Sequence, residues 1–113
     1  MATISQTRSS VAYGIEKLAW TGITQADATD TFQPGSRRQI GSLQATGTFT
    51  SATLALQGSN DGSNYVTVKD MYGNAASLSA AGTIDFQTHY LTYKLQGGGT
   101  TLSAAATIIL RDA

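Results

Sequence analysis

A chain of 113 residues has the length of one domain, and it can bury about two-thirds of its unfolded surface in a single core. Seven basic and seven acidic side chains give a formal net charge of zero, which argues against nucleic acid and acidic membranes as partners, because both are normally bound by clustered basic surfaces. Charged residues make up only 12% of the chain. A surface with so few charges and no net charge favours self-association. The absence of cysteine excludes disulfides and thiolate metal sites.

The first ten residues, Met1–Ser10, are polar and show no hydrophobic period. We therefore expect residues 1–10 to form an extended N-terminal arm and residues 11–113 to form a single β domain. The beginning of the chain has no apolar segment typical of a secretory signal, and no run of 18 apolar residues follows. We expect the chain to be made in the cytosol and to stay there.

The remaining sequence alternates with a period of two, which is typical of strands with one buried face. Val11–Trp20 changes phase part of the way along, which indicates a bulge or a bend. The predicted strands, in chain order, are Val11–Trp20, Ala26–Phe32, Gln39–Phe49, Thr53–Gln57, Tyr65–Lys69, Ala75–Ala81, Tyr90–Gln96 and a long final strand that contains Leu102–Leu110. The side chains expected to point inward from the middle and last strands include Leu54, Leu56, Val66, Val68, Leu91, Tyr93 and Leu95.

Turn sequences separate these runs at short intervals, and Gly97–Gly99 is expected to join the last two strands. Several short strands with regular turns predict an all-β fold. We expect a single β-sandwich of jelly-roll type with about seven or eight strands.

The segment GSNDGSN, residues 58–64, is either a metal loop or a chain reversal. Asp61 supplies one carboxylate, whereas calcium loops of useful affinity bring several. Asn60, Asp61 and Gly62 are residue types that tolerate positive φ and cap their own backbone, so the segment mainly indicates a hairpin.

Catalytic patterns are weak throughout the chain. Asp27 and Asp30 are close in sequence, but no nucleophile accompanies them. His89 is the single histidine, which excludes sites built from several histidines. We expect no enzyme activity, no catalytic residue, no cofactor and no metal.

The aromatic residues raise one further possibility, since aromatic rings on a β-sandwich stack against sugars in many binding modules. Tyr13, Trp20, Tyr65 and Tyr72 could play this role, although their spacing equally suits core and rim packing. Carbohydrate binding, in a separate module or in a fibre that contacts surface glycans, is therefore the alternative function.

Three blocks of sequence resemble a known group of proteins: GTFTSATLALQGSNDGSNYVTVKD, YGNAASLSAAGT and HYLTYKLQGGGTTLSAAATIIL. In this order they are similar to small virion proteins of tailed bacteriophages, of the capsid decoration or cement type. The match extends from about Tyr13 to Leu110.

The resemblance implies a homo-oligomeric β-sandwich on the capsid surface of a virion that is assembled in the host cytoplasm. The expected partners are the major capsid protein and other copies of the chain, most simply as a homotrimer. Arg8 in the arm, together with Arg37 and Arg38 in the PGSRR segment, are the candidate contacts with an acidic patch of a partner.

Overall fold

The computed structural model describes residues 3–12, 15–34, 39–88 and 90–111, and for residues 8–12 it describes the backbone alone. Nine strands belong to one continuous sheet. The described ranges contain no helix, and therefore no helix that could cross a membrane. The prediction of an all-β fold is confirmed. The strands are β1 (Thr3–Ile4), β2 (Thr7–Ala12), β3 (Ile15–Thr24), β4 (Ala28–Thr29), β5 (Ile40–Ser59), β6 (Val66–Thr67), β7 (Ser77–Leu78), β8 (Gly82–Gln87) and β9 (Thr92–Arg111).

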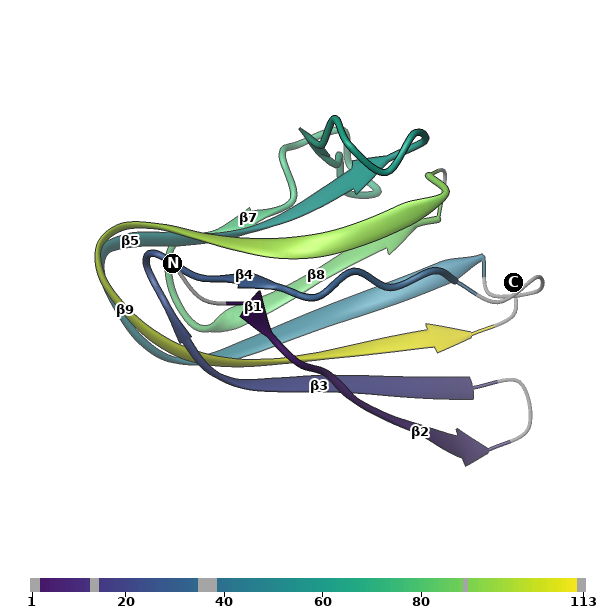
Figure 1. The fold of residues 1–113 in the computed structure, drawn as a ribbon, viewed down its shortest axis with the longest axis horizontal. Coiled ribbons are helices and arrows are strands. Elements are labelled where there is room, and N and C mark those ends of the chain that lie inside the picture. Colours follow the sequence, from purple (N-terminus) through teal and green to yellow (C-terminus); the bar gives the residue numbers. More distant parts are fainter. Residues whose placement is uncertain (1–2, 13–14, 35–38, 89, 112–113) are drawn as a thin grey trace.

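The two longest strands, β5 and β9, form an antiparallel ribbon at the centre of the sheet. Their pairing keeps one register from Ile40 opposite Arg111 to Ser59 opposite Thr92. A straight strand of 20 residues would be about 66 Å long. The longest extent of the molecule is only 37 Å, so the ribbon has to fold back on itself, as Figure 1 shows at its left-hand side.

The ribbon bends where both strands adopt left-handed backbone conformations. Gly47 in β5 has a φ of 122° and Gly99 in β9 has a φ of 94°. A Cβ atom at Gly99 would overlap the carbonyl oxygen of Ser51, and one at Gly47 would overlap that of Ser103. Ser51 itself has a φ of 47°. The bend therefore depends on glycine at two places, because a side chain would collide with the opposite strand.

The bend divides the sheet into two layers, which we name from their positions in Figure 1. The lower layer has the order β2–β3–β9–β5–β8 and uses residues 40–48 of β5 and 103–111 of β9. In the upper layer, residues 92–99 of β9 pair with β4, which pairs with β1, while residues 52–59 of β5 pair with β6 and β7.

The core fills the space between the layers. Aliphatic side chains from both layers are fully buried, among them Leu18, Leu43, Ile108 and Leu110 from the lower layer and Leu54, Leu56 and Leu95 from the upper layer. Tyr93 lies at the centre of an aromatic cluster, with ring centroids 5.5 Å from Phe32, 5.9 Å from Phe86 and 6.0 Å from Tyr90. Trp20 extends this cluster, with its ring centroid 5.7 Å from that of Phe32.

The form of the sheet differs from the predicted jelly-roll sandwich. A jelly roll has two separate sheets, whereas here β5 and β9 are neighbours in both layers and connect them without interruption. Gly97–Gly99 does not form a turn between two strands, because all three glycines lie inside β9. The pairs of strands predicted on either side of the bend are therefore halves of β5 and β9.

The segment expected to be an extended arm contributes two strands to the sheet. β1 pairs with β4, and β2 pairs antiparallel with β3. The N–H of Asp30 donates to the carbonyl of Ile4 at 2.8 Å, and the N–H of Gln6 donates to the Asp30 carboxylate at 3.2 Å. This segment is held by backbone groups, which a hydrophobic pattern does not reveal.

The substitution Gly99→Ala tests the bend. We expect it to lower the free energy of unfolding by about 2 kcal/mol or more, because alanine disfavours this φ and its Cβ would collide with Ser51. Gly98→Ala is the matched control, since its Cβ would meet only the Thr53 hydroxyl, at 3.4 Å, and should change stability by less than about 1 kcal/mol. Urea denaturation measures both variants, and equal losses would contradict this role of Gly99.

Candidate interaction surface

The GSNDGSN segment forms a loop that is closed by its own side chains. Asp61 Oδ1 accepts hydrogen bonds from the Ser59 hydroxyl and from the N–H groups of Ser63 and Asn64, at 2.8 to 2.9 Å. Asp61 Oδ2 accepts a fourth from the Asn64 side-chain amide at 2.8 Å. The Ser59 hydroxyl in turn accepts from the N–H groups of Asp61 and Gly62. β5 and β6 pair antiparallel on the two sides of this loop.

These donors determine the ionisation of Asp61. The N–H of Asn64, followed by that of Ser63, holds the pKa of the Asp61 carboxyl well below its usual range, because hydrogen bonds to a carboxylate stabilise the charged form. Both carboxylate oxygens are occupied within the loop. Across the described ranges, no three His, Cys, Asp or Glu side chains are grouped as a metal site would require. The chemistry of Asp61 is therefore that of a turn rather than of a calcium ligand.

A second carboxylate stiffens the neighbouring hairpin, residues 69–75. Asp70 Oδ1 accepts hydrogen bonds from the N–H groups of Tyr72 and Asn74, at 2.8 and 2.9 Å, and the Asp70 N–H donates to the carbonyl of Asn74 at 2.7 Å. The N–H of Met71 donates to the carbonyl of Asp85 in β8 at 3.1 Å, which fixes the hairpin to the sheet. The ring of Tyr72 is 88% exposed at the tip of this hairpin.

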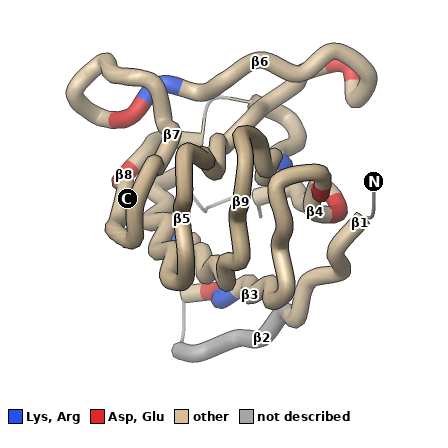
Figure 2. Tube along the Cα trace, turned by 90° about the vertical axis from the view of Figure 1, so that its left-hand side faces the viewer, with Lys and Arg blue, Asp and Glu red and all other residues tan. Residues whose placement is uncertain are grey.

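Four large hydrophobic side chains are exposed among the described residues, and we call them the exposed apolar group: Val66, Met71, Tyr72 and Leu91, with exposed fractions of 53, 45, 88 and 58%. Three of them lie in residues 66–72, a segment that crosses the top of the upper layer in Figure 2. Asn60 Oδ1 accepts a hydrogen bond from the N–H of Leu91 at 3.0 Å, which connects the fourth to the GSNDGSN loop that precedes this segment.

The predicted inward orientation of Val66 and Leu91 is wrong. β6 contains only two residues and pairs only with β5, so Val66 is at the margin of the sheet. Leu91 precedes β9, and its N–H bonds to the loop instead of to a strand. Leu54, Leu56, Val68, Tyr93 and Leu95 are buried as predicted.

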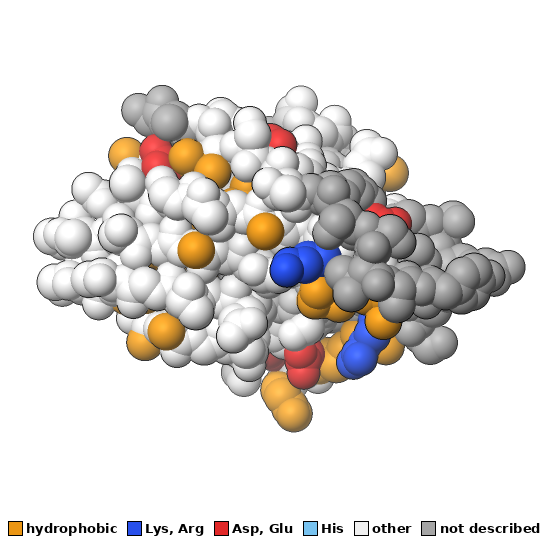
Figure 3. Space-filling model, turned by 90° about the horizontal axis from the view of Figure 1, so that it is seen from below, with side chains coloured by type: hydrophobic (Ala, Val, Ile, Leu, Met, Phe, Trp, Pro, Cys, Tyr) orange, Lys and Arg blue, Asp and Glu red, His pale blue; other side chains and the backbone are white. Residues whose placement is uncertain are grey.

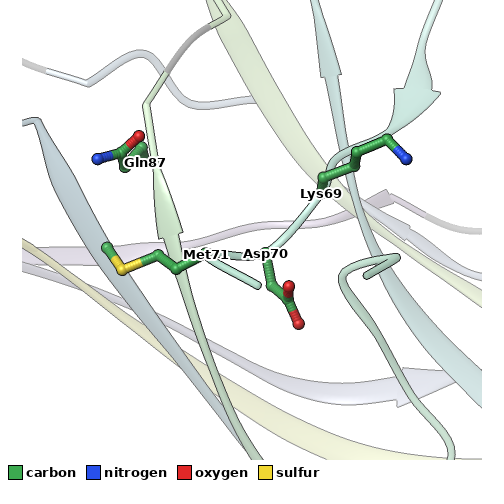
Figure 4. Close-up of a pocket in the computed structure, with 4 residues that line it drawn as sticks. All are labelled: Lys69, Asp70, Met71 and Gln87. Carbon is green, nitrogen blue, oxygen red and sulfur yellow. The ribbon is translucent and has the colours of Figure 1, made fainter. Parts of the chain in front are cut away.

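A pocket of about 300 Å³ lies between the hairpin and the end of β8, lined by Lys69, Asp70, Met71 and Gln87. Figure 4 shows the side chains of Met71 and Gln87 on one side of it, while Lys69 extends in the opposite direction. The volume is at the lower limit for small-molecule sites, and Asp70 Oδ1 is already used by the hairpin. The pocket suits contact with a partner's side chain better than enclosure of a ligand.

The outward side of the lower layer, which we call the polar face, has few charges. Figure 3 views the molecule from the side on which β2 and β3 lie, where most visible atoms belong to uncharged polar side chains or backbone. One row of paired residues crosses four strands of this face: Lys17 of β3, Ile109 of β9, Ser42 of β5 and Asp85 of β8. Its two ends carry opposite charges, and both charged side chains are exposed.

The candidate sugar-binding aromatics do not form a common platform. Trp20 is only 1% exposed, and its indole N–H donates to Asp30 Oδ1 at 2.8 Å, so it belongs to the core. Tyr65 is half-buried, and the Lys94 amine lies 4.5 Å from its ring centroid. Tyr72 alone is freely exposed, and Tyr13 lies outside the described residues.

The other residues singled out in the sequence are dispersed. The backbone of Arg8 lies in β2, opposite Leu18. Arg37, Arg38 and His89 lie outside the described residues. Asp27 is buried, and its Oδ2 accepts hydrogen bonds from the N–H and the hydroxyl of Thr24, at 2.9 Å each. Because Asp30 is bonded to the Trp20 indole, the two acids serve separate structural purposes.

No protein-family model and no curated protein sequence matches this chain. Among solved structures, the fold is similar to that of the SPBc2 prophage-derived protein YomS, with a TM-score of 0.63, 12% sequence identity, and coverage of 90% of this chain and 98% of the other. It is also similar to PliG of Aeromonas hydrophila, a periplasmic inhibitor of g-type lysozyme, with a TM-score of 0.51, 11% identity, and coverage of 99% and 96%. At these identities, the likeness shows a shared fold.

The ionisation of Asp61 can be measured by an NMR titration of its carboxyl carbon. We expect its pKa to be well below the ordinary aspartate value of about 3.9. Since the folded-state pKa is lowered, the stabilisation from these hydrogen bonds is fully present above about pH 4 and is lost as the pH falls through the folded-state value. In Asn64→Ala, which lacks the side-chain donor, the pKa should rise. An ordinary pKa in the unmodified protein would contradict the loop geometry.

Proposed function

We propose that this protein is a structural component of a bacteriophage particle that decorates the capsid and stabilises the shell. The observation that carries the proposal is the fold, which is shared with a prophage-derived protein over almost the full length of both chains. The resemblance of the GSNDG-containing blocks to phage virion proteins supports the same role. The low charge of the chain agrees with a protein that works in contact with other proteins.

The exposed apolar group supplies the contact with the shell in this proposal. Tyrosine is enriched among the residues that dominate binding energy, and Tyr72 is exposed at the tip of a hairpin held by Asp70. A loop that is already ordered loses little conformational entropy when it binds. The basic residues Arg8, Arg37 and Arg38 remain candidate contacts with acidic side chains of the same partner.

The proposed mechanism is binding, and no catalytic step is involved. The major capsid protein is the partner, and the protein binds where its subunits meet. Because such a site exists only in the assembled shell, binding of the protein at this site stabilises the shell by mass action. The virion resemblance implies a homotrimer, and a trimer would bind more tightly than one copy because its second and third contacts become intramolecular.

Glycan binding is less well supported as the alternative. It requires several exposed rings, and Trp20 is buried in the core while the Lys94 amine lies over the ring of Tyr65. Tyr72 by itself provides one ring without a second to complete a stacking platform.

The composition of purified particles tests the proposed function. Quantitative mass spectrometry should find this protein in a copy number comparable with that of the major capsid protein, and particles that lack it should release their DNA at a lower temperature. Absence from the particle would overturn the proposal. A few copies per particle would assign the protein to the tail or a fibre and would overturn the capsid role.

The substitution Tyr72→Ala tests the contact surface. We expect binding to shells that lack the protein to weaken at least about tenfold, because a central exposed aromatic residue is lost. The fold should be unaffected, since the ring is 88% exposed. Tyr72→Phe keeps the ring and should bind within about threefold of the unmodified protein. Sedimentation of the shells with bound protein gives the affinities, and undiminished binding of Tyr72→Ala would contradict this surface.

A further inference from the structure

The polar face of the lower layer has an arrangement of charge that suits contact with a copy of itself. In the row that crosses this face, Lys17 lies on β3 beside Ser9 of the edge strand β2, and Asp85 lies on β8 at the opposite edge. Ile109 and Ser42 lie between them and are half-buried. Three strand spacings separate the two charges, which is about 14 Å. The row therefore has a positive end, an uncharged middle and a negative end.

A row of this kind is complementary to its own two-fold copy. When two such faces pack together around an axis that runs along the strands between β9 and β5, β3 of one copy lies over β8 of the other. Lys17 then faces the second copy's Asp85, and the same pair forms again at the opposite end of the row. Stacked sheets are about 10 Å apart, a gap that lysine and aspartate side chains can bridge from the two sides.

The neighbouring row does not oppose this arrangement. It contains Ile15, Arg111, Ile40 and Gln87 on the same side of the layer. Under the same axis, Arg111 faces Ile40 of the other copy, and Ile15 faces Gln87. No two like charges meet in these rows, and each half-buried isoleucine is covered by a residue of the other copy. An axis across the strands would instead place Lys17 over Lys17, which would be repulsive.

We infer that the polar face is a two-fold contact between copies of this chain, with two Lys17–Asp85 ion pairs that fix its register. Four strands about 19 Å wide and nine residues about 30 Å long offer about 600 Å² per copy. The total of about 1,200 Å² is at the lower limit for specific interfaces, so the dimer should dissociate on dilution. The contact needs only the chain itself and does not depend on the capsid role, but it replaces the homotrimer that the virion resemblance implies.

The test exchanges the charges at Lys17 and Asp85. The molar mass of each variant in solution, measured over a range of protein concentrations, reports how strongly it dimerises. The unmodified protein should be a dimer at high concentration. Lys17→Glu and Asp85→Lys should each weaken the dimer at least tenfold, because two-fold symmetry converts two attractive pairs into two repulsive ones. The double variant Lys17→Glu/Asp85→Lys restores both pairs in reverse and should return the dimerisation constant to within about threefold.

Two controls keep the result specific. Ser79→Glu and Ser79→Lys change the charge at an exposed position in the β7–β8 connection and should leave the dimer unchanged. Circular dichroism should show the same fold for every variant, since both Lys17 and Asp85 are exposed. Each of four results would overturn the contact. The unmodified protein could be a monomer at all concentrations, or it could be a trimer. The single variants could dimerise like the unmodified protein, or the double variant could stay dissociated. A trimer would at the same time agree with the oligomer that the virion resemblance implies.

Discussion

The unbroken register between β5 and β9 is the constraint on which the rest of the structure depends. Every other strand except β1 and β2 pairs directly with one of these two, and β1 and β2 are one strand further away. β5 and β9 keep the same pairing register as they pass from one layer to the other. One bend in this ribbon therefore sets the relative positions of the layers, whereas in a sandwich of two independent sheets a packing angle sets them. The sharpness of that bend depends on Gly47 and Gly99, where the opposite backbone leaves no room for a side chain.

In this chain with few charges, several carboxylates hold loops and chain segments in place by accepting hydrogen bonds. Asp61 and Asp70 each close a loop at the margin of the upper layer, and Asp30 connects the N-terminal segment to the Trp20 indole. Each carboxylate accepts hydrogen bonds from backbone or side-chain groups close to it. The hairpin that carries Tyr72 is consequently held by its own hydrogen bonds, without help from a large core beneath it. A surface of this kind can present apolar side chains to water while keeping a fixed shape, which is what a protein-binding site requires.

The sequence predicted the buried side of the strands better than it predicted their connections. Alternation identified Leu54, Leu56 and Leu95 as core residues, because a period of two reports which side chains share a face. It could not distinguish a turn from a bend at Gly97–Gly99, since both need glycine and only the partner strand decides between them. β8 was missed although Ile84 and Phe86 alternate with polar residues, and β1 and β2 were missed because backbone pairing holds them to the sheet. The aromatic residues show the same limit: their spacing suited core and rim packing equally, and the tertiary structure buries Trp20 and exposes Tyr72.

The two proposed contact surfaces differ in the physics of recognition. The exposed apolar group contains one freely exposed ring, Tyr72, and in the proposed role this ring enters a partner's pocket, where its desolvation dominates the binding energy. The polar face is broad, and in the proposed contact its specificity lies in the placement of Lys17 and Asp85 rather than in buried apolar area. The exposed apolar group lies on loops and on a short edge strand beside the upper layer, whereas the polar face is the outer side of the lower layer. The two surfaces meet at the hairpin of residues 69–75, where the N–H of Met71 donates to the carbonyl of Asp85 at 3.1 Å, so binding at one surface acts directly on the edge of the other.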